Sequence, residues 1–292
     1  MADRAVGLTT TALALGAALA YGASDFLAGV WSRRTSFAAV ALVAQVAALL
    51  VVAATAAATG HRTPTATALG WGAASGVGAG LGTLFLYRGL GRGRMGVVAP
   101  LSALGAAVLP AALGLALGER PPLPVLLGIA CALPAIALVS TPPRAPESKP
   151  VPGSGGQGAG LLDGLVAGAC FALLFICLER AGHAGGLWPV VAGQASSLVL
   201  LLGAVTIRGT RARISPAALA GSALVGALGG LAGMSYALAT GPQRLAVVAV
   251  LTSLYPAVTV ALARVGLGER VGRVQALGLG LAAAAVTLVV LH

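Results

Sequence analysis

Few side chains in this sequence could carry chemistry, and the carboxylate of Asp25 stands out among them. Asp25 lies in a long apolar stretch, six positions before Trp31, or about 9 Å along a helix axis. A carboxylate away from water is costly unless it faces a partner or a cavity, so such an acid is a functional candidate that could exchange a proton. The alternative is a structural ion pair, for which Arg88 is the candidate partner.

The neighbours of Asp25 favour a cavity on one side of this segment. On a helix, Ala14, Ala18, Tyr21, Gly22 and Asp25 form one stripe of small and polar residues. Other polar residues also recur at helical spacing in later apolar stretches, and together they could line the same cavity. Each hydroxyl could instead bond its own helix backbone or a neighbouring helix. The candidates for substrate or proton contact are Tyr21, Asp25, Gln45, Thr83, Tyr87, Ser102, Gln194, Tyr236, Thr252 and Tyr255.

The sequence offers little support for enzyme chemistry. Asp25 has no second acid deep in an apolar stretch to pair with, and no phosphate-binding loop with its lysine is present. The three histidines, His61, His183 and His292, are expected in loops or at the terminus. We therefore expect no metal site and no cofactor, and a membrane-embedded transferase is the enzymatic alternative.

The elements that must position these residues are membrane-spanning helices. The chain is 58% hydrophobic and only 9% charged, whereas soluble domains carry roughly 25% charged residues. A span needs about 20 mostly apolar residues and satisfies its backbone polar groups as a helix. Ten such stretches are predicted: 8–30, 37–58, 66–87, 95–117, 123–140, 161–179, 187–207, 215–239, 245–263 and 271–291.

Residues 141–160 interrupt this pattern, because they are rich in Pro, Gly and Ser and almost free of apolar side chains. This is the composition of a linker. It divides the chain into two predicted units of five spans each, residues 1–140 and 161–292.

The two units resemble each other at an offset of 150 residues. Residues 95–120 and 245–270 share 12 identities in 26 positions, and both stretches end in Gly-Glu-Arg. Shared composition alone would give roughly three or four matches. In each copy we expect the glycine to end a helix in the left-handed conformation. The charged pair then forms either a local ion pair at the membrane interface or a gate.

Basic residues predict how the two units cross the membrane. One set of alternate loops, with the linker, carries 13 of the 18 basic residues, and the other set, with Arg4, carries five. By the positive-inside rule, the first set and the linker are cytosolic, and both termini lie outside. The second five-span unit is therefore inverted relative to the first, an arrangement typical of secondary transporters.

The sequence resembles the EamA-type branch of the drug/metabolite transporter superfamily. The resemblance rests on "AYGASDFLAG" in the first span, and on "GVVAPLSALGAAVLPAALGLALGER" and "AVVAVLTSLYPAVTVALARVGLGER" in spans four and nine. It implies a ten-helix bundle with a central cavity and transport of small metabolites or drugs. Several members of this family have cytosolic termini, whereas the charges here place them outside. The family often has a neutral amide where this chain has Asp25, so a role for Asp25 is not inherited.

Two further patterns concern packing. Gly72, Gly76, Gly80, Gly226 and Gly230 form small-residue faces that suit close helix contacts, and they could also act as hinges. In the ninth span, a proline at position 256 is expected to loosen the helix.

The sequence therefore predicts an all-α membrane protein of ten helices in two inverted five-helix repeats, located in the cytoplasmic membrane. Its expected function is secondary transport of small organic metabolites or drugs by alternating access, with proton coupling through Asp25. The alternatives are a non-transporting membrane subunit or scaffold, and a channel. Expected partners are a small-molecule substrate, lipid and a proton, with the chain a monomer or homodimer. The basic charge lacks interleaved aromatic residues, so no nucleic-acid partner is expected.

Overall fold

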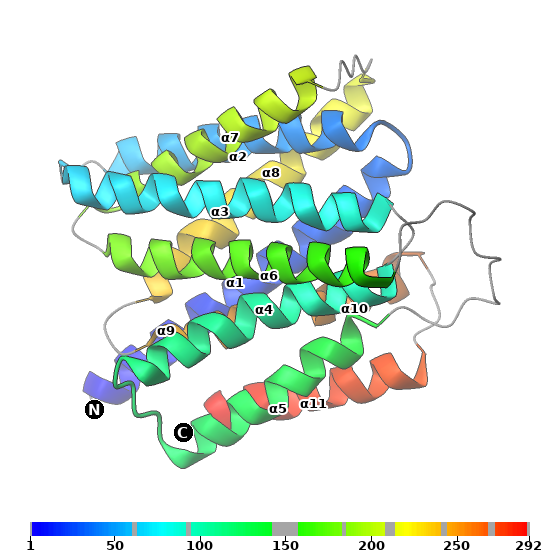
Figure 1. The fold of residues 1–292 in the computed structure, drawn as a ribbon. Helices are drawn as coiled ribbons and strands as arrows, with labels where there is room; N and C mark the ends of the chain where they lie inside the picture. The colour runs from blue at the N-terminus through cyan, green and yellow to red at the C-terminus, as the bar shows by residue number, and fades with distance from the viewer. Residues whose placement is uncertain are drawn as a thin grey trace.

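The computed structural model of the chain describes residues 2–59, 63–91, 95–141, 157–182, 185–207, 214–240, 244–267 and 272–290. These residues are helical apart from short turns and caps, and no strand occurs among them. Figure 1 shows the helices packed side by side in one bundle. Their bounds are α1 (Ala2–Ser32), α2 (Phe37–Thr59), α3 (Ala66–Gly91), α4 (Met95–Ala116), α5 (Leu123–Val139), α6 (Gln157–Ala181), α7 (Trp188–Ile207), α8 (Pro216–Ala239), α9 (Leu245–Thr252), α10 (Tyr255–Leu267) and α11 (Arg273–Val290).

Membrane-spanning character is clear for most of these helices. Within the described residues, eight helical segments are long and apolar enough to cross a membrane. Two of the ten predicted spans correspond to shorter apolar stretches, Leu101–Ala116 and Leu123–Val139. The chain is therefore an all-helical integral membrane protein.

The bundle has two ends, which we name after the turns that lie there. Residues 33–36 connect α1 to α2 at the α1–α2 end, and residues 117–122 connect α4 to α5 at the α4–α5 end. The start of α1 and the end of α11 both lie at the α4–α5 end (Figure 1).

Small residues allow the helices to approach closely. The largest helix contacts join α3 to α6 and α7, α8 to α1 and α2, α4 to α6, and α5 to α11. Alanine is the commonest apolar residue in the interior, which lets backbones come near one another in lipid. The glycines of the predicted packing faces lie at such contacts: Gly72 faces Pro189, Gly76 faces Gly193, Gly80 faces Leu200, Gly226 faces Ala44 and Gly230 faces Val52.

A matched pair of glycines in α3 tests this packing. A Cβ at Gly72 would overlap the backbone of Pro189 in α7, whereas a Cβ at Gly70 would meet nothing within 4 Å. We expect Gly72→Ala to lower the melting temperature of the purified protein by ~5 °C, because the two helices must move apart. Gly70→Ala should leave it unchanged or raise it slightly, since alanine favours a helix. Equal effects of the two variants would contradict this account of the packing.

The ninth predicted span is broken into two helices. α9 ends at Thr252, and α10 begins at Tyr255 after a turn at Ser253 and Leu254. Pro256 has no N–H to donate to the carbonyl of Thr252, four residues earlier, so the helical ladder cannot continue there. The expected loosening at this proline is confirmed, and the two parts of the span can pack against different neighbours.

Candidate functional site

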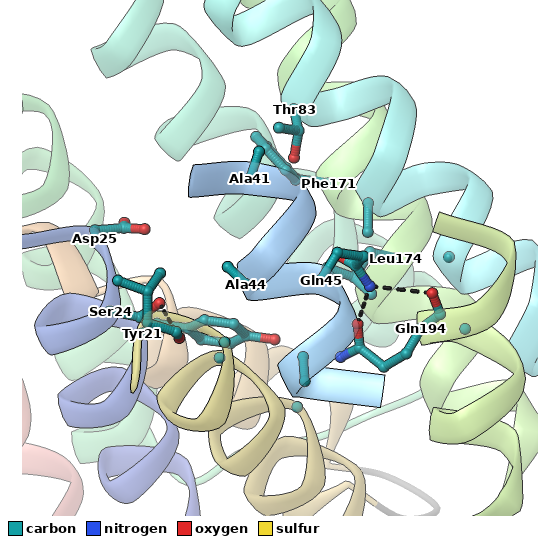
Figure 2. Close-up of a pocket in the computed structure, with 18 of the residues that line it drawn as sticks. Tyr21, Ser24, Asp25, Ala41, Ala44, Gln45, Thr83, Phe171, Leu174 and Gln194 are labelled. Atoms are coloured by element: carbon teal, nitrogen blue, oxygen red, sulfur yellow. Dashed lines mark hydrogen bonds between the residues drawn. The ribbon is translucent and has the colours of Figure 1, made fainter. Parts of the chain in front are cut away.

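A cavity of about 270 Å³ lies among α1, α2, α3, α6, α7 and α8 (Figure 2), with one residue each from α4 and α10. Its walls are largely Ala, Gly and apolar side chains, with a few polar groups between them. Small-molecule sites usually have this character and volumes from about 300 Å³ upward. The lining extends to Phe37, the first residue of α2, and therefore to the α1–α2 end of the bundle. The space suits a small organic molecule.

One face of α1 supplies the acid of this cavity. Tyr21, Ser24, Asp25 and Ala28 line it, and their spacing of three and four residues places them on one side of the helix. The Ser24 hydroxyl donates a hydrogen bond to the Val225 carbonyl at 2.9 Å, which ties α1 to α8. Asp25 is exposed at the cavity wall, and its carboxylate makes no hydrogen bond or ion pair within the described part of the chain.

The aromatic ring of Tyr21 connects this face to α10. The rings of Tyr21 and Tyr255 meet edge to face, with centroids 6.2 Å apart and an angle of 61° between the planes. The Thr259 hydroxyl donates a 3.1 Å hydrogen bond to the Gly22 carbonyl, one turn further along α10. α10 is thereby fixed against the part of α1 that carries Asp25.

Two glutamines form a polar bridge across the cavity wall. The Gln45 amide nitrogen on α2 donates to the Gln194 side-chain oxygen on α7, and to the Gln194 main-chain oxygen at 3.0 Å. Both residues line the cavity, and the hydroxyl of Tyr21 points toward them (Figure 2). These two predicted contact residues are therefore each other's partners.

Six of the ten predicted contact residues line the cavity: Tyr21, Asp25, Gln45, Thr83, Gln194 and Tyr255. Ser102 and Thr252 are buried in the helix packing away from it. Tyr236 is fully buried, and its hydroxyl donates to the Phe175 carbonyl at 3.2 Å. The side chain of Tyr87 lies outside the described residues.

Arg88 does not pair with Asp25, which was the alternative to a functional role for this acid. Its guanidinium bonds Asp163 near the start of α6, with Nε 2.9 Å and Nη2 2.5 Å from Oδ1. The Asp163 side chain is fully buried, while 40% of the Arg88 side chain is exposed. The guanidinium also lies over the Phe85 ring, 4.4 Å from its centroid. The ion pair joins α3 to α6 at the α1–α2 end and leaves Asp25 to the cavity.

The ion pair predicts a stability effect that a double variant can isolate. Arg88→Gln removes the cation from a buried carboxylate, and we expect a loss of about 2 kcal/mol in the free energy of unfolding. Asp163→Asn in the same chain should restore much of this loss, because the buried negative charge is gone. Thermal unfolding of the two single variants and the double variant measures the coupling. Additive losses would contradict a direct interaction.

A second acid outside the predicted set joins two helices at the opposite end of the bundle. Glu119, in the first Gly-Glu-Arg copy, is buried and accepts hydrogen bonds from the backbone N–H groups of Leu245, at 2.7 Å, and Ala246, at 3.0 Å. These groups form the first turn of α9, where a negative charge is favourable. The carboxylate therefore joins the first half of the chain to the second at the α4–α5 end.

The local sequence explains how Glu119 reaches this position. Gly118 has a φ of 96°, the left-handed conformation predicted for the end of the helix. The Glu119 carboxylate lies against Gly114, where a Cβ would come within 2.7 Å of its oxygen. The neighbouring contact from Arg244 to the hydroxyl of Thr10, at 2.7 Å, ties α1 to the start of α9. The corresponding copy at residues 268–270 lies outside the described residues.

Comparison with protein families identifies the second half of this bundle. Residues 158–291 match the EamA-like transporter family. The match covers just under half of the chain, and this part of the sequence is similar to that family. Its members are membrane transporters of the drug/metabolite transporter superfamily, so the comparison indicates a membrane transporter.

The EamA-like match is accompanied by a structural likeness over the whole chain. A solved structure titled only "Crystal structure of protein" aligns with a TM-score of 0.75 and 16% sequence identity, over 96% of this chain and 95% of that chain. At this identity the likeness concerns the fold alone. No curated protein matches the sequence.

Proposed function

We propose that this chain is a secondary transporter that moves small organic metabolites or drugs across the cytoplasmic membrane by alternating access. The observation that carries the proposal is the cavity, which both halves of the chain enclose and which contains an acid and a pair of amides. A binding site between two related halves is the usual arrangement in such carriers. Because one chain lines the cavity, a monomer is sufficient, and a homodimer would contain two such cavities.

The pairing of helices supports an inverted repeat with units at 1–140 and 161–292 and a linker at 141–160. In this repeat, α1, α2, α3 and α5 of the first unit correspond to α6, α7, α8 and α11 of the second. The contacts of α3 with α6 and α7 therefore correspond to those of α8 with α1 and α2. α5 and α11 correspond to each other and are also in contact, as an inverted repeat requires of a pair beside its axis.

Individual residues follow the same exchange. Gly76 faces Gly193 on α7, and its counterpart Gly226 faces Ala44 on α2. Gln45 and Gln194 are 149 positions apart, one fewer than the offset of 150 residues, and bond each other, as expected of nearly equivalent residues beside a two-fold axis. Two related halves that meet in this way can exchange conformations, which is the basis of alternating access.

The two ends of the bundle suggest which conformation is present. At the α4–α5 end, the contacts of Glu119 and Arg244 hold α9 against the first half. The cavity lining reaches Phe37, the first residue of α2, at the opposite, α1–α2 end, and it also includes Val190 near the start of α7. With the basic loops on the cytosolic side, this conformation faces the cytosol, and the linker is cytosolic while both termini lie outside.

The break between α9 and α10 offers a place for movement between conformations. α9 is fixed by Glu119, whereas α10 contacts the part of α1 beside Asp25. The short turn at Ser253 and Leu254 lies between these two attachments. Movement at this turn would allow the cavity wall to shift while α9 stays anchored.

We propose that Asp25 couples transport to protons. It is the charged residue of the cavity, and Tyr21 and Tyr255 are the other titratable side chains in its lining. A carboxylate that faces a hydrated cavity inside a membrane can bind a proton on one side and release it on the other. Transport rather than catalysis is the expected activity.

Counterflow in proteoliposomes tests the carrier proposal. Vesicles loaded with each unlabelled solute of a metabolite and drug panel receive a trace of the labelled solute outside. A carrier accumulates the label transiently against its own gradient, whereas a channel only equilibrates it. A non-transporting subunit or scaffold, the alternative function, gives no uptake above that of empty vesicles for any solute.

A further inference from the structure

We propose that the cavity binds small organic cations, whose charged nitrogen lies against Asp25 and whose apolar or aromatic body lies along the aromatic side chains nearby. This inference rests on the proposed carrier function and names the substrate class of the same cavity. It follows from the charge, the partners and the shape of the residues that line it.

The charge of the lining favours a cation. Of the residues that line the cavity, all of them in the described part of the chain, Asp25 alone carries a charge. Arg88, the basic residue at the end of α3, is bound to Asp163. A cavity with one carboxylate and low-dielectric walls attracts cations and disfavours anions.

Two acids in the described part of the α1–α2 end differ in a way that points to a ligand. Asp163 is buried and has an arginine partner. Asp25 has no described hydrogen-bond or ion-pair partner and faces the cavity. A charged carboxylate in a membrane protein needs water or an opposite charge nearby. A cationic substrate would supply that charge only while it is bound, which suits a carrier.

Aromatic side chains near Asp25 suit the same ligand. Tyr21 is one helical turn before Asp25, and its ring contacts Tyr255, which also lines the cavity. Phe37, Phe171 and Phe175 add three further rings to the lining. Aromatic faces attract ammonium groups and also pack against an apolar body. A volume of about 270 Å³ limits the ligand to a compact molecule.

The far wall supplies polar contact without charge. In Figure 2 the amides of Gln45 and Gln194 lie on the opposite side of the cavity from Asp25. An amide pair can donate to or accept from a hydroxyl or amide of the substrate. It cannot neutralise a carboxylate. The arrangement therefore distinguishes the charged end of a ligand from its uncharged end.

Three probes with one aromatic ring and different charges test the proposal. Benzyltrimethylammonium is a permanent cation, benzyl alcohol is neutral and phenylacetate is an anion. Binding of each to the purified full-length protein in detergent is measured by isothermal titration calorimetry. The variants are Asp25→Asn and Glu179→Gln, which removes the same charge from the α4–α5 end, outside the cavity lining. Thermal unfolding verifies that both variants are folded.

We expect benzyltrimethylammonium to bind the wild type at least about tenfold more tightly than either other probe. Asp25→Asn should remove this preference, and Glu179→Gln should retain it. The proposal is overturned if phenylacetate or benzyl alcohol binds as tightly, if no probe binds, or if a folded Asp25→Asn variant binds the cation unchanged. The comparison of probes on the wild type remains decisive if the Asp25 variant does not fold. Counterflow of any solute from the wider panel would preserve the carrier function in each of these cases.

Discussion

Proton flux driven by a solute gradient is expected to fall to the level of empty vesicles in Asp25→Asn. Asp25 is the only carboxylate among the described residues that line the cavity. Asparagine has nearly the same shape but cannot bind and release a proton in the physiological range. We therefore expect a decrease of at least about tenfold in proton flux, while counterflow of an uncharged solute, which needs neither net proton movement nor the charge of Asp25, decreases less.

A pH-sensitive dye inside proteoliposomes measures this flux when the solute is added outside. Glu179→Gln is the matched control, because it removes a carboxylate near the other end of the bundle and should leave the flux near the wild-type level. Flux that persists in folded Asp25→Asn would assign proton coupling to another group. Asp25 would then be a binding or structural residue.

Glu119→Gln is expected to weaken the closure of the α4–α5 end by about 2 kcal/mol. The carboxylate accepts two hydrogen bonds from backbone N–H groups in the first turn of α9, and both hydrogen bonds are buried. The amide of glutamine has one acceptor oxygen, and its NH₂ group would face a backbone N–H. A loss of this size would raise the population with this end open by about thirtyfold if closure dominates in the wild type.

The population with the α4–α5 end open can be measured from the reactivity of a cysteine in the cavity. The background is a variant in which the native cysteines are replaced, at Cys131, Cys170 and Cys177. In this background, Ala44→Cys places a thiol in the cavity lining. This thiol should react faster with a reagent applied at the α4–α5 end when Glu119→Gln is also present. Arg120→Gln, at the exposed neighbouring residue, should not change the rate. An equal rate with and without Glu119→Gln would show that this contact does not control closure.

Hydropathy and turn residues predicted the elements well, because both depend on local sequence. Long apolar stretches gave the positions of the helices, and two chain-local signals were confirmed: the positive φ of Gly118 and the break before Pro256. These features need only the backbone preferences of glycine and proline and the length of a membrane crossing.

Partners distant in sequence could not be predicted in the same way. Glu119 bonds residues 126 and 127 positions away, and Asp163 meets Arg88 across 75 positions. Nothing in the local sequence of an acid reveals which helix end or arginine will lie beside it. The pairing of Gln45 with Gln194 was not predicted either, because at the offset of 150 residues Gln45 corresponds to Ala195.

The faces of the helices were also difficult to assign. Most spans are apolar on all sides, because lipid and the helix interior accept the same residues. The small and polar stripe on α1 was informative, and it placed Tyr21 and Asp25 on one side. Ser102 and Thr252 have the same residue types but lie in the packing between helices. Hydroxyl groups therefore mark a cavity poorly unless an acid or amide accompanies them.

Access to the cavity from the two sides of the membrane tests the central claim most directly. In the cysteine-replaced background, Ala44→Cys is treated with a membrane-impermeant maleimide from one face or the other, in vesicles of known orientation. Alternating access predicts labelling from each face, with bound solute changing the ratio of the two rates. Labelling confined to one face under every condition, with and without solute and with Glu119→Gln, would contradict the account.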